Sequence, residues 1–148
     1  MSDKDIDIAG AIRNLGGDIL DLPFWEACRD GRFLLHRCNV CGRHYWPASR
    51  CVVHGAQSMA WLPASGRGTL YTYTVMHHAY TPTMKGKTPY VVAVIRLDEG
   101  PYFHSNLIDC TLDQVRIGMQ LQSAMIEQDN GLVVPVFRPT FESQETTA

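Results

Sequence analysis

The stretch Cys38-Asn39-Val40-Cys41-Gly42 is followed along the chain by a second one with the same spacing, Cys51-Val52-Val53-His54-Gly55. Two ligands separated by two residues can hold one ion from a tight turn. The glycine after each pair permits a left-handed backbone that points amide N–H groups at the ligand atoms. Four such side chains provide the tetrahedral set that zinc prefers and leave no coordination position for water or substrate. The spacing therefore predicts a structural Zn²⁺ ion bound by Cys38, Cys41, Cys51 and His54, which stabilises a hairpin with little core of its own.

Other interpretations of these residues remain open at this point. A single Cys-x2-Cys pair can be a redox motif, although no helix pattern follows this one and a second pair stands beside it. An iron–sulfur cluster would favour a fourth cysteine in place of His54. A different threading of the chain would let His36 or His44 replace His54 as the ligand. The remaining cysteines, Cys28 and Cys110, are expected to be small buried apolar residues rather than nucleophiles.

Two short helical patterns precede the motif. The first lies over Ile8–Leu15, and the second extends over Asp21–Gly31, where Asp21 is placed to cap a helix. Phe24 and Trp25 are bulky for so short a helix. We expect them to anchor it, either on the protein's own body or on another subunit.

Downstream of the motif the sequence changes to short strands separated by turns. The expected strands are Leu70–Met76, Tyr90–Leu97, Tyr102–Ile108, Met119–Glu127 and Leu132–Phe137. The segment Thr111–Gln114 matches a capping box that begins one helical turn, and Asp129–Gly131 is typical of a hairpin turn. Five strands with a helical insertion after the third favour a closed barrel of the oligonucleotide/oligosaccharide-binding type, the OB-fold, over an open sandwich, which stays the alternative.

These patterns together predict a mainly β chain with N-terminal helices, a small zinc ribbon and a five-stranded OB-fold barrel. Within the ribbon, Phe33–Arg37 and His44–Pro47 are expected to be short strands. The expected divisions are an N-terminal helical arm at 1–31, the zinc ribbon at 32–62, the barrel at 63–140 and a disordered tail at 141–148.

The composition excludes several classes of protein. Of the 148 residues 45% are apolar, which rules out bulk disorder, and the 13 basic and 15 acidic residues give a net charge of −2. That charge argues against non-specific nucleic-acid binding, which needs a basic surface. No apolar run approaches the roughly 18 residues of a membrane span, and the N-terminal residues lack the apolar core of a signal peptide. We therefore expect a cytoplasmic protein with reduced cysteines.

The sequence also resembles a known family. It is similar to the acyl-CoA-associated proteins that join a rubredoxin-like zinc ribbon to an OB-fold, over about residues 22–139. The matching segments, in order, are PFWEA (Pro23–Ala27), RFLLHRCNVCGRHYWPASRCVVHG (Arg32–Gly55), SGRGTLYTYTV (Ser65–Val75), PYVVAVIRLDEGP (Pro89–Pro101), RIGM (Arg116–Met119) and VPVFRP (Val134–Pro139). The family often presents four cysteines, whereas here the fourth ligand position is His54.

The resemblance implies a non-catalytic accessory subunit. Members of this family pair with thiolase-like catalytic subunits, with acyl-CoA aldolases or with hydratases, forming hetero-oligomers in which the partner supplies the catalytic residues. The zinc-ribbon protein is then expected to bridge subunits and to help bind the CoA thioester. Binding coenzyme A needs cationic donors, an aromatic or apolar platform and a groove. The candidate ligands for it are Arg67, His77, His78, Tyr80, Lys85 and Lys87.

Two further functions stay in play as alternatives. Zinc ribbons and OB barrels also occur in single-stranded nucleic-acid-binding proteins, and four aromatic residues could offer stacking faces. They are Tyr71, Tyr73, Tyr102 and Phe103. An independent enzyme that uses the loop histidines His77 and His78 is the other alternative, which a closed zinc site and the lack of a nucleophile motif disfavour.

Overall fold

The computed structural model describes residues 6–140, so the tail expected at 141–148 lies outside the described residues, as do 1–5. The described chain forms two compact units. We call them the ribbon unit, with residues 6–66, 99–101 and 125–135, and the barrel unit, with residues 67–98, 102–124 and 136–140. The boundaries predicted for the arm, ribbon and barrel remain a prediction.

The ribbon unit begins with two helices, α1 (Ile8–Asn14) and α2 (Leu22–Arg29), joined by the short 3-10 helix η1 (Ile19–Asp21). Asp21 occupies the N-cap position of α2, but its side chain makes no capping bond there. Its carboxylate instead accepts the backbone N–H of Ala48 at 2.7 Å, which ties the helix start to the 46–50 loop. Asp21 therefore makes a hydrogen bond to a residue distant in sequence, Ala48, in place of the expected capping hydrogen bond within α2.

Phe24 anchors α2 in an aromatic cluster, as expected from its size. Its side chain is 0% exposed, and its ring centroid lies 4.0 Å from that of Trp46 and 5.6 Å from that of Phe33. Trp25 packs edge-on against Phe24 at 5.0 Å. Both rings therefore anchor the helix on the protein's own ribbon unit.

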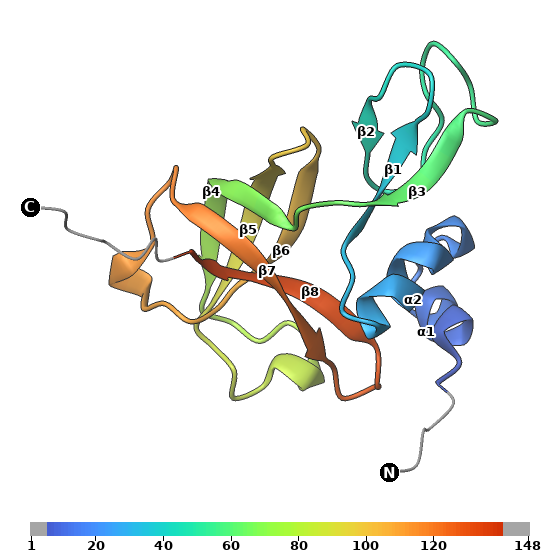
Figure 1. Ribbon diagram of the computed structural model, residues 1–148. Helices are drawn as coiled ribbons and strands as arrows, with labels where there is room; N and C mark the ends of the chain where they lie inside the picture. Colours follow the sequence, from blue (N-terminus) through green and yellow to red (C-terminus); the bar gives the residue numbers. More distant parts are fainter. Residues whose placement is uncertain (1–5, 141–148) are drawn as a thin grey trace, which may run out of the picture. The chain divides into compact units, whose positions relative to one another are not determined.

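A three-stranded antiparallel sheet follows the helices, with the order β2-β1-β3 (Figure 1). Its strands are β1 (Leu34–Cys38), β2 (His44–Tyr45) and β3 (Met59–Pro63). The first two correspond to the predicted strands, whereas β3 was missed. Met59–Pro63 carries no β-branched residue, and its strand conformation comes from full-length pairing with β1.

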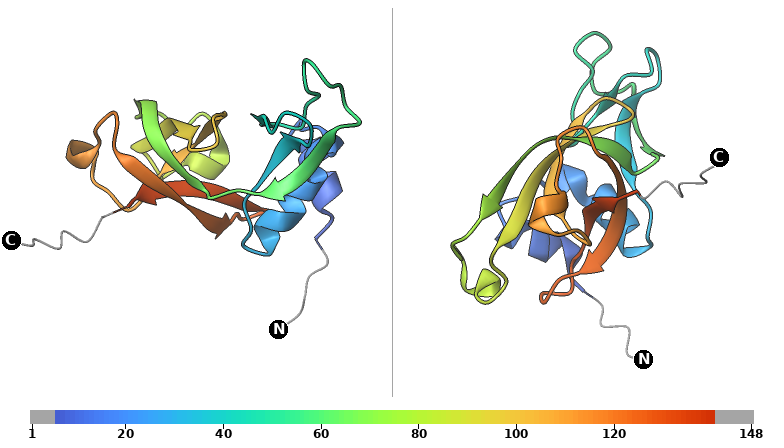
Figure 2. Two further views of the ribbon diagram at one scale, coloured as in Figure 1. Left: turned by 45° about the horizontal axis from the view of Figure 1, so that its top comes forward. Right: turned by 90° about the vertical axis from the view of Figure 1, so that its left-hand side faces the viewer.

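The barrel contains five strands in the closed order β4-β5-β6-β8-β7 (Figure 2). They are β4 (Arg67–Met76), β5 (Tyr90–Leu97), β6 (Tyr102–Leu107), β7 (Gln120–Glu127) and β8 (Val133–Pro139). The closed barrel confirms the OB-type prediction and excludes the open sandwich. The short 3-10 helix η3 (Leu112–Gln114) lies between β6 and β7, and the predicted capping box of Thr111 and Gln114 is formed. A second 3-10 helix, η2 (Pro82–Met84), lies in the loop between β4 and β5.

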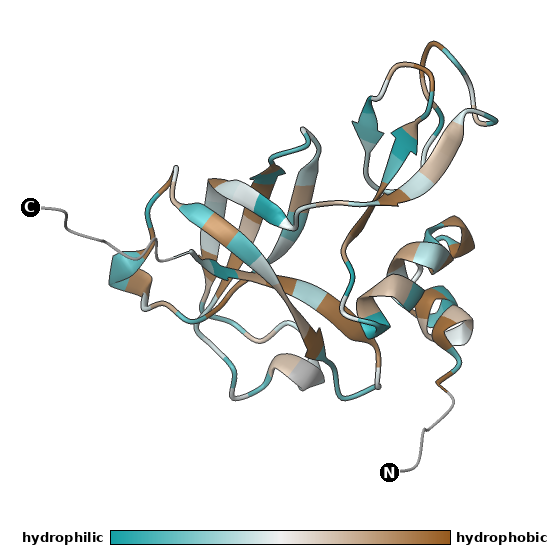
Figure 3. Cartoon of the chain, viewed as in Figure 1, coloured by the Kyte–Doolittle hydropathy of each residue, from teal (hydrophilic) through white to brown (hydrophobic). Residues whose placement is uncertain are grey.

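Hydrophilic and hydrophobic residues are mixed along the barrel strands (Figure 3), and in β5 the burial of the side chains alternates. In β5, Val91, Ala93, Ile95 and Leu97 are buried, while the residues between them are half-buried or exposed. Gly68 of β4 allows close strand packing, because a Cβ there would lie 2.6 Å from the carbonyl oxygen of Arg96. In the described part of the chain the longest helix, α2, has eight residues, and no helix is long and apolar enough to span a membrane.

Candidate metal centre

The first half of the site is the loop between β1 and β2. Cys38 ends β1, and its carbonyl oxygen accepts the N–H of Gly42 at 2.8 Å. The N–H of Cys38 donates to the carbonyl oxygen of Arg43 at 3.0 Å, which closes the loop. Gly42 has a φ of 75°, the left-handed conformation expected after the ligand pair.

The second half repeats this geometry between β2 and β3. Cys51 and Gly55 exchange both backbone hydrogen bonds, with N···O distances of 3.2 and 2.9 Å. Gly55 has a φ of 77°, close to that of Gly42. The sequence therefore builds two tight turns of similar shape, each of which presents a pair of ligand side chains.

The two turns bring the four predicted ligands together. Their ligand atoms all lie within 4.8 Å of one another. The Sγ atoms of Cys41 and Cys51 are 3.7 Å apart, and Nδ1 of His54 lies 3.5 Å from Sγ of Cys51 and 3.6 Å from Sγ of Cys38. This cluster could hold a metal ion.

Those distances agree with tetrahedral coordination. Zinc–sulfur bonds of about 2.3 Å and zinc–nitrogen bonds of about 2.0 Å, at a tetrahedral angle, put two sulfur ligands about 3.8 Å apart. The same angle puts a sulfur and a nitrogen ligand about 3.5 Å apart. The three separations given above match these values, and the remaining pairs lie within 4.8 Å, so the three thiols and the imidazole could hold one ion of this size.

Local hydrogen bonds favour the thiolate form that a metal needs. The backbone N–H of Val53 and that of His54 outweigh burial and lower the pKa of Cys51 to about 5. Burial acts against the thiolate of Cys38, but the hydroxyl of Ser58, 3.2 Å from its Sγ, helps to lower that pKa to about 7. Two of the thiols are therefore prepared for ligation before an ion binds.

The remaining two ligands respond to these thiolates. The N–H of Arg43 favours the thiolate of Cys41, but burial and the neighbouring Cys38 and Cys51 raise its pKa. The pKa of His54 is also raised, mainly by its contact with Cys51. Part of the rise at Cys41 comes from electrostatic repulsion between its thiolate and that of Cys38. A cation at the centre of the cluster would offset this repulsion.

The other histidines of the ribbon unit have different roles. His36 uses its Nδ1 to accept the N–H of Ser49 at 3.0 Å, and its ring packs on Trp61 with centroids 4.6 Å apart. His44 lies in β2 and pairs with Arg37. Among the described residues His54 is therefore the histidine of the cluster, and the alternative threadings through His36 or His44 are wrong.

The two remaining cysteines lie outside the cluster. Cys28 is 0% exposed in α2, and burial raises its pKa to about 12. Cys110 is half-buried, and burial raises its pKa too. Both thiols therefore stay protonated at neutral pH, as expected for residues that are not nucleophiles.

The candidate coenzyme A ligands occupy two separate places in the barrel unit. Arg67 begins β4, where its Nε donates to Oε1 of Gln122 at 3.1 Å. The other candidates are exposed in the loop of residues 77–89, where the rings of His78 and Tyr80 lie 4.9 Å apart. These loop candidates are His77, His78, Tyr80, Lys85 and Lys87. Arg67 is the first residue of β4 and the loop follows its last residue, Met76, so the two groups of candidates stand at opposite ends of this strand.

The aromatic residues considered for base stacking differ in exposure: some lie on the outside of the barrel and one lies in its core. Tyr71 and Tyr102 are exposed, with ring centroids 5.0 Å apart, and Tyr73 is half-buried. Phe103 is only 4% exposed and packs against Phe137 at 6.0 Å, so it cannot stack on a base. The prediction is wrong for Phe103.

Two residues of the metal cluster's surroundings were not found from sequence. Ser58 contacts Cys38, and the hydroxyl of Tyr45 accepts the N–H of Val52 at 3.4 Å beside the second turn. Neither residue stands at a ligand spacing. Only the pairing of β3 with β1 brings Ser58 next to the cluster.

Comparison with known proteins identifies relatives along most of the chain. A family model described as "ChsH2, C-terminal OB-fold domain" matches residues 61–125. A DUF35 domain-containing scaffold protein of Methanocaldococcus jannaschii is 35% identical over 115 residues, which cover 76% of this chain and 81% of that protein. The solved structure of the Ltp2-ChsH2(DUF35) aldolase contains a chain that matches with a TM-score of 0.74 and 32% identity, covering 82% of this chain and 95% of that one.

A longer relative matches as well. A probable enoyl-CoA hydratase alpha subunit of Thermomonospora curvata is 35% identical over 128 residues, which cover 85% of this chain. The chain spans 40% of the length of that subunit. The similarity therefore concerns one part of a larger protein.

Proposed function

Since the chain belongs to the DUF35 family, we propose that it is a non-catalytic, zinc-binding accessory subunit of an enzyme complex that acts on acyl-CoA thioesters. The membership confirms the resemblance found in the sequence, because the matches include an OB-fold domain and a subunit named for enoyl-CoA chemistry. The proposed role is to bridge subunits of a hetero-oligomer and to help bind the CoA thioester.

The closed metal cluster is the observation that carries the non-catalytic role. Cys38, Cys41, Cys51 and His54 provide four protein ligand atoms, all within 4.8 Å of one another. A zinc ion bound by all four has no coordination position left for water or substrate, which is the property of a structural site. Its function is then to hold β1, β2 and β3 together, because so small a sheet has little core.

The catalytic partner is proposed to be thiolase-like, with an aldolase or a hydratase as the alternatives. The name of one relative, a probable enoyl-CoA hydratase alpha subunit, supports a partner that acts on CoA thioesters, and the solved structure is named as an aldolase. Within this chain, the exposed loop of residues 77–89 and Arg67 are the proposed contacts with coenzyme A, as two separate positions. Among the described residues, Phe103, one of the four aromatic residues considered for base stacking, is buried, which weakens the nucleic-acid alternative.

Copurification followed by reconstitution tests the proposal. The full-length chain, tagged and expressed in its native host, is expected to retain a larger subunit that mass spectrometry identifies as an acyl-CoA enzyme. Acyl-CoA turnover is expected from the pair and not from the isolated chain. Turnover of acyl-CoA by the isolated, metal-loaded chain would refute the non-catalytic role, and full activity of the partner alone would refute the accessory role.

A further inference from the structure

A recess of about 540 Å³ lies in the ribbon unit, beside the three-stranded sheet and outside the metal cluster. This volume falls within the range of about 300–1,000 Å³ typical of small-ligand sites. Three apolar residues and four that can stack or form hydrogen bonds line it. They are Leu20, Ala48 and Ala56, and His36, Ser49, Arg50 and Trp61.

The rings of Trp61 and His36 stack on each other and together form an aromatic platform at the wall of this recess. Their ring centroids are 4.6 Å apart with an interplanar angle of 32°. Trp61 is also held from the core side, since its ring centroid lies 6.3 Å from that of Trp46 and 6.4 Å from that of Phe24. A platform fixed in this way can stack a planar base without losing much side-chain entropy.

His36 adds a hydrogen-bond donor to the platform. Its Nδ1 accepts the backbone N–H of Ser49 at 3.0 Å, so the proton of the neutral ring is on Nε2. Burial lowers the pKa of His36, which favours this neutral form. The ring is therefore flat and uncharged, and its one N–H donor points along the ring plane, toward a group at the ring edge and not toward a base stacked on its face.

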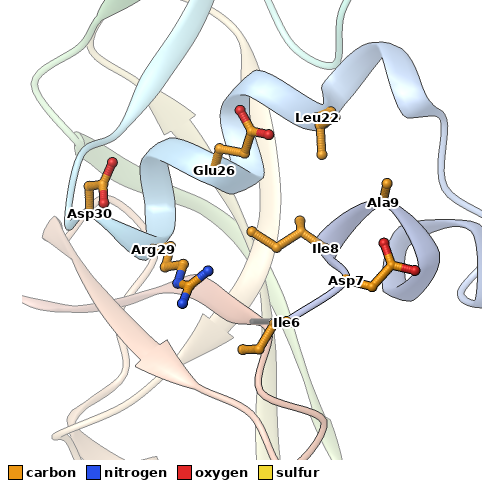
Figure 4. Close-up of a pocket in the computed structure, with 8 residues that line it drawn as sticks. All are labelled: Ile6, Asp7, Ile8, Ala9, Leu22, Glu26, Arg29 and Asp30. Carbon is orange, nitrogen blue, oxygen red and sulfur yellow. The ribbon is translucent and has the colours of Figure 1, made fainter. Parts of the chain in front are cut away.

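This recess differs in the charge of its lining residues from a second recess in the ribbon unit. Arg50 supplies a guanidinium, and the lining itself contains no carboxylate, while the carboxylate of Asp21 is engaged by the N–H of the lining residue Ala48 and also acts on His36. The second recess, about 760 Å³ between α1 and α2, has the carboxylates of Asp7, Glu26 and Asp30 around the single cation Arg29 (Figure 4). An anionic ligand is favoured beside Arg50 and opposed between the helices.

We propose that the recess lined by Trp61, His36 and Arg50 binds the nucleotide end of the CoA thioester. The adenine ring stacks on the outer face of the pair that Trp61 and His36 form, and the guanidinium of Arg50 pairs with a phosphate group. This assignment deepens the proposed function and depends on it. It moves the nucleotide contact from the loop of residues 77–89 to the ribbon unit.

Two soluble probes test the assignment on the full-length, metal-loaded chain. Adenosine 3′,5′-bisphosphate reproduces the adenine and the 3′-phosphate of coenzyme A, and adenosine reproduces the base without charge. Calorimetry and tryptophan fluorescence are expected to detect both. Arg50→Gln is expected to weaken binding of the bisphosphate by roughly tenfold, as loss of a charged hydrogen bond does, and to leave adenosine binding unchanged.

Matched variants separate the recess from the rest of the ribbon. Arg43→Gln is the control, because Arg43 is also an exposed arginine of the ribbon unit but packs over Tyr45, away from the recess lining. Trp61→Leu is expected to weaken both probes. Because Trp61 also contacts the aromatic cluster, Arg50→Gln keeps the test decisive if Trp61→Leu fails to fold.

The outcomes distinguish this assignment from the proposed function. No binding of either probe, or binding that Arg50→Gln and Arg43→Gln weaken equally, would overturn the assignment to the recess. Binding that instead depends on Lys85 and Lys87, measured with Lys85→Gln and Lys87→Gln, would also overturn it while leaving the CoA-binding role in place. The proposed function fails separately, when the reconstituted complex has no acyl-CoA activity that depends on this chain.

Discussion

Replacing one ligand, in Cys51→Ser, is expected to release the metal. Sγ of Cys51 lies 3.7 Å from Sγ of Cys41 and 3.5 Å from Nδ1 of His54, so it is one of four ligands in a closed set. Structural zinc sites in small peptides contribute about 10–16 kcal/mol of binding free energy at neutral pH. An equal share for each ligand corresponds to a loss of roughly a hundredfold to a thousandfold in affinity.

The assay is a competition between the protein and a chromophoric zinc chelator at fixed pH. Cys110→Ser is the matched control, because Cys110 is a half-buried cysteine that is not part of the cluster. We expect the control to keep the affinity of the unmodified chain within about threefold. His54→Cys is expected to keep zinc as well, because a fourth thiolate is also a good ligand.

The reasoning would be refuted if Cys51→Ser held zinc as tightly as Cys110→Ser does. Such a result would mean that the four side chains do not act as one coordination sphere. Circular dichroism and proteolysis would accompany the titration. Loss of zinc is expected to expose residues 33–62 to cleavage and to leave the barrel strands protected.

Three other predictions concern stability. Phe24→Ala is expected to lower the free energy of unfolding by about 3–5 kcal/mol in urea denaturation, because Phe24 is 0% exposed in the aromatic cluster; a change below about 1 kcal/mol would contradict this packing. Gly68→Ala is expected to cost about 1–3 kcal/mol in the same assay, because its new Cβ would meet Ile95 and the backbone of Arg96; an unchanged midpoint would show that the strands can move apart. Burial raises the pKa of Cys28 from 9.0 to about 12, so between these values the unfolded chain loses a proton that the folded chain keeps. The free energy of unfolding should therefore fall as pH rises above about 9, by at most about 1.4 kcal/mol per pH unit, and Cys28→Ala should remove that contribution.

The metal cluster could be predicted because each pair of ligands is specified by a short, continuous stretch of sequence. Each ligand pair is a turn of four residues, and Gly42 and Gly55 supply the positive φ that closes each turn. Which histidine completes the set was harder, because it depends on how β1 pairs with its neighbours. The structure settles it by committing His36 to Ser49 and Trp61.

The strands of the barrel were predicted from β-branched runs and turn residues, and β5 was found with the same bounds. β3 was missed because Met59–Pro63 has no alternating pattern and becomes a strand only through its partner. The CoA-binding role of Arg67 and the loop residues stays a prediction, and the sequence alone did not show that they stand at opposite ends of β4. Arg67 precedes the 77–89 loop by only ten residues in sequence, yet those residues form one extended strand.

The recess was not visible in the sequence at all. Leu20, His36, Arg50 and Trp61 are far apart along the chain and belong to four different segments of the ribbon unit. Sequence patterns report which face of one element is apolar, and they do not report which faces form a common cavity. Only the tertiary arrangement of these segments determines which residues line the recess together.

X-ray absorption at the zinc edge, combined with elemental analysis of the purified full-length chain, examines the closed coordination sphere itself. The result we expect is one zinc per chain, with three sulfur ligands at about 2.3 Å and one nitrogen ligand at about 2.0 Å. Protein that is folded without metal, or a sphere that contains a water oxygen in place of Nδ1 of His54, would contradict a structural site and with it the non-catalytic role.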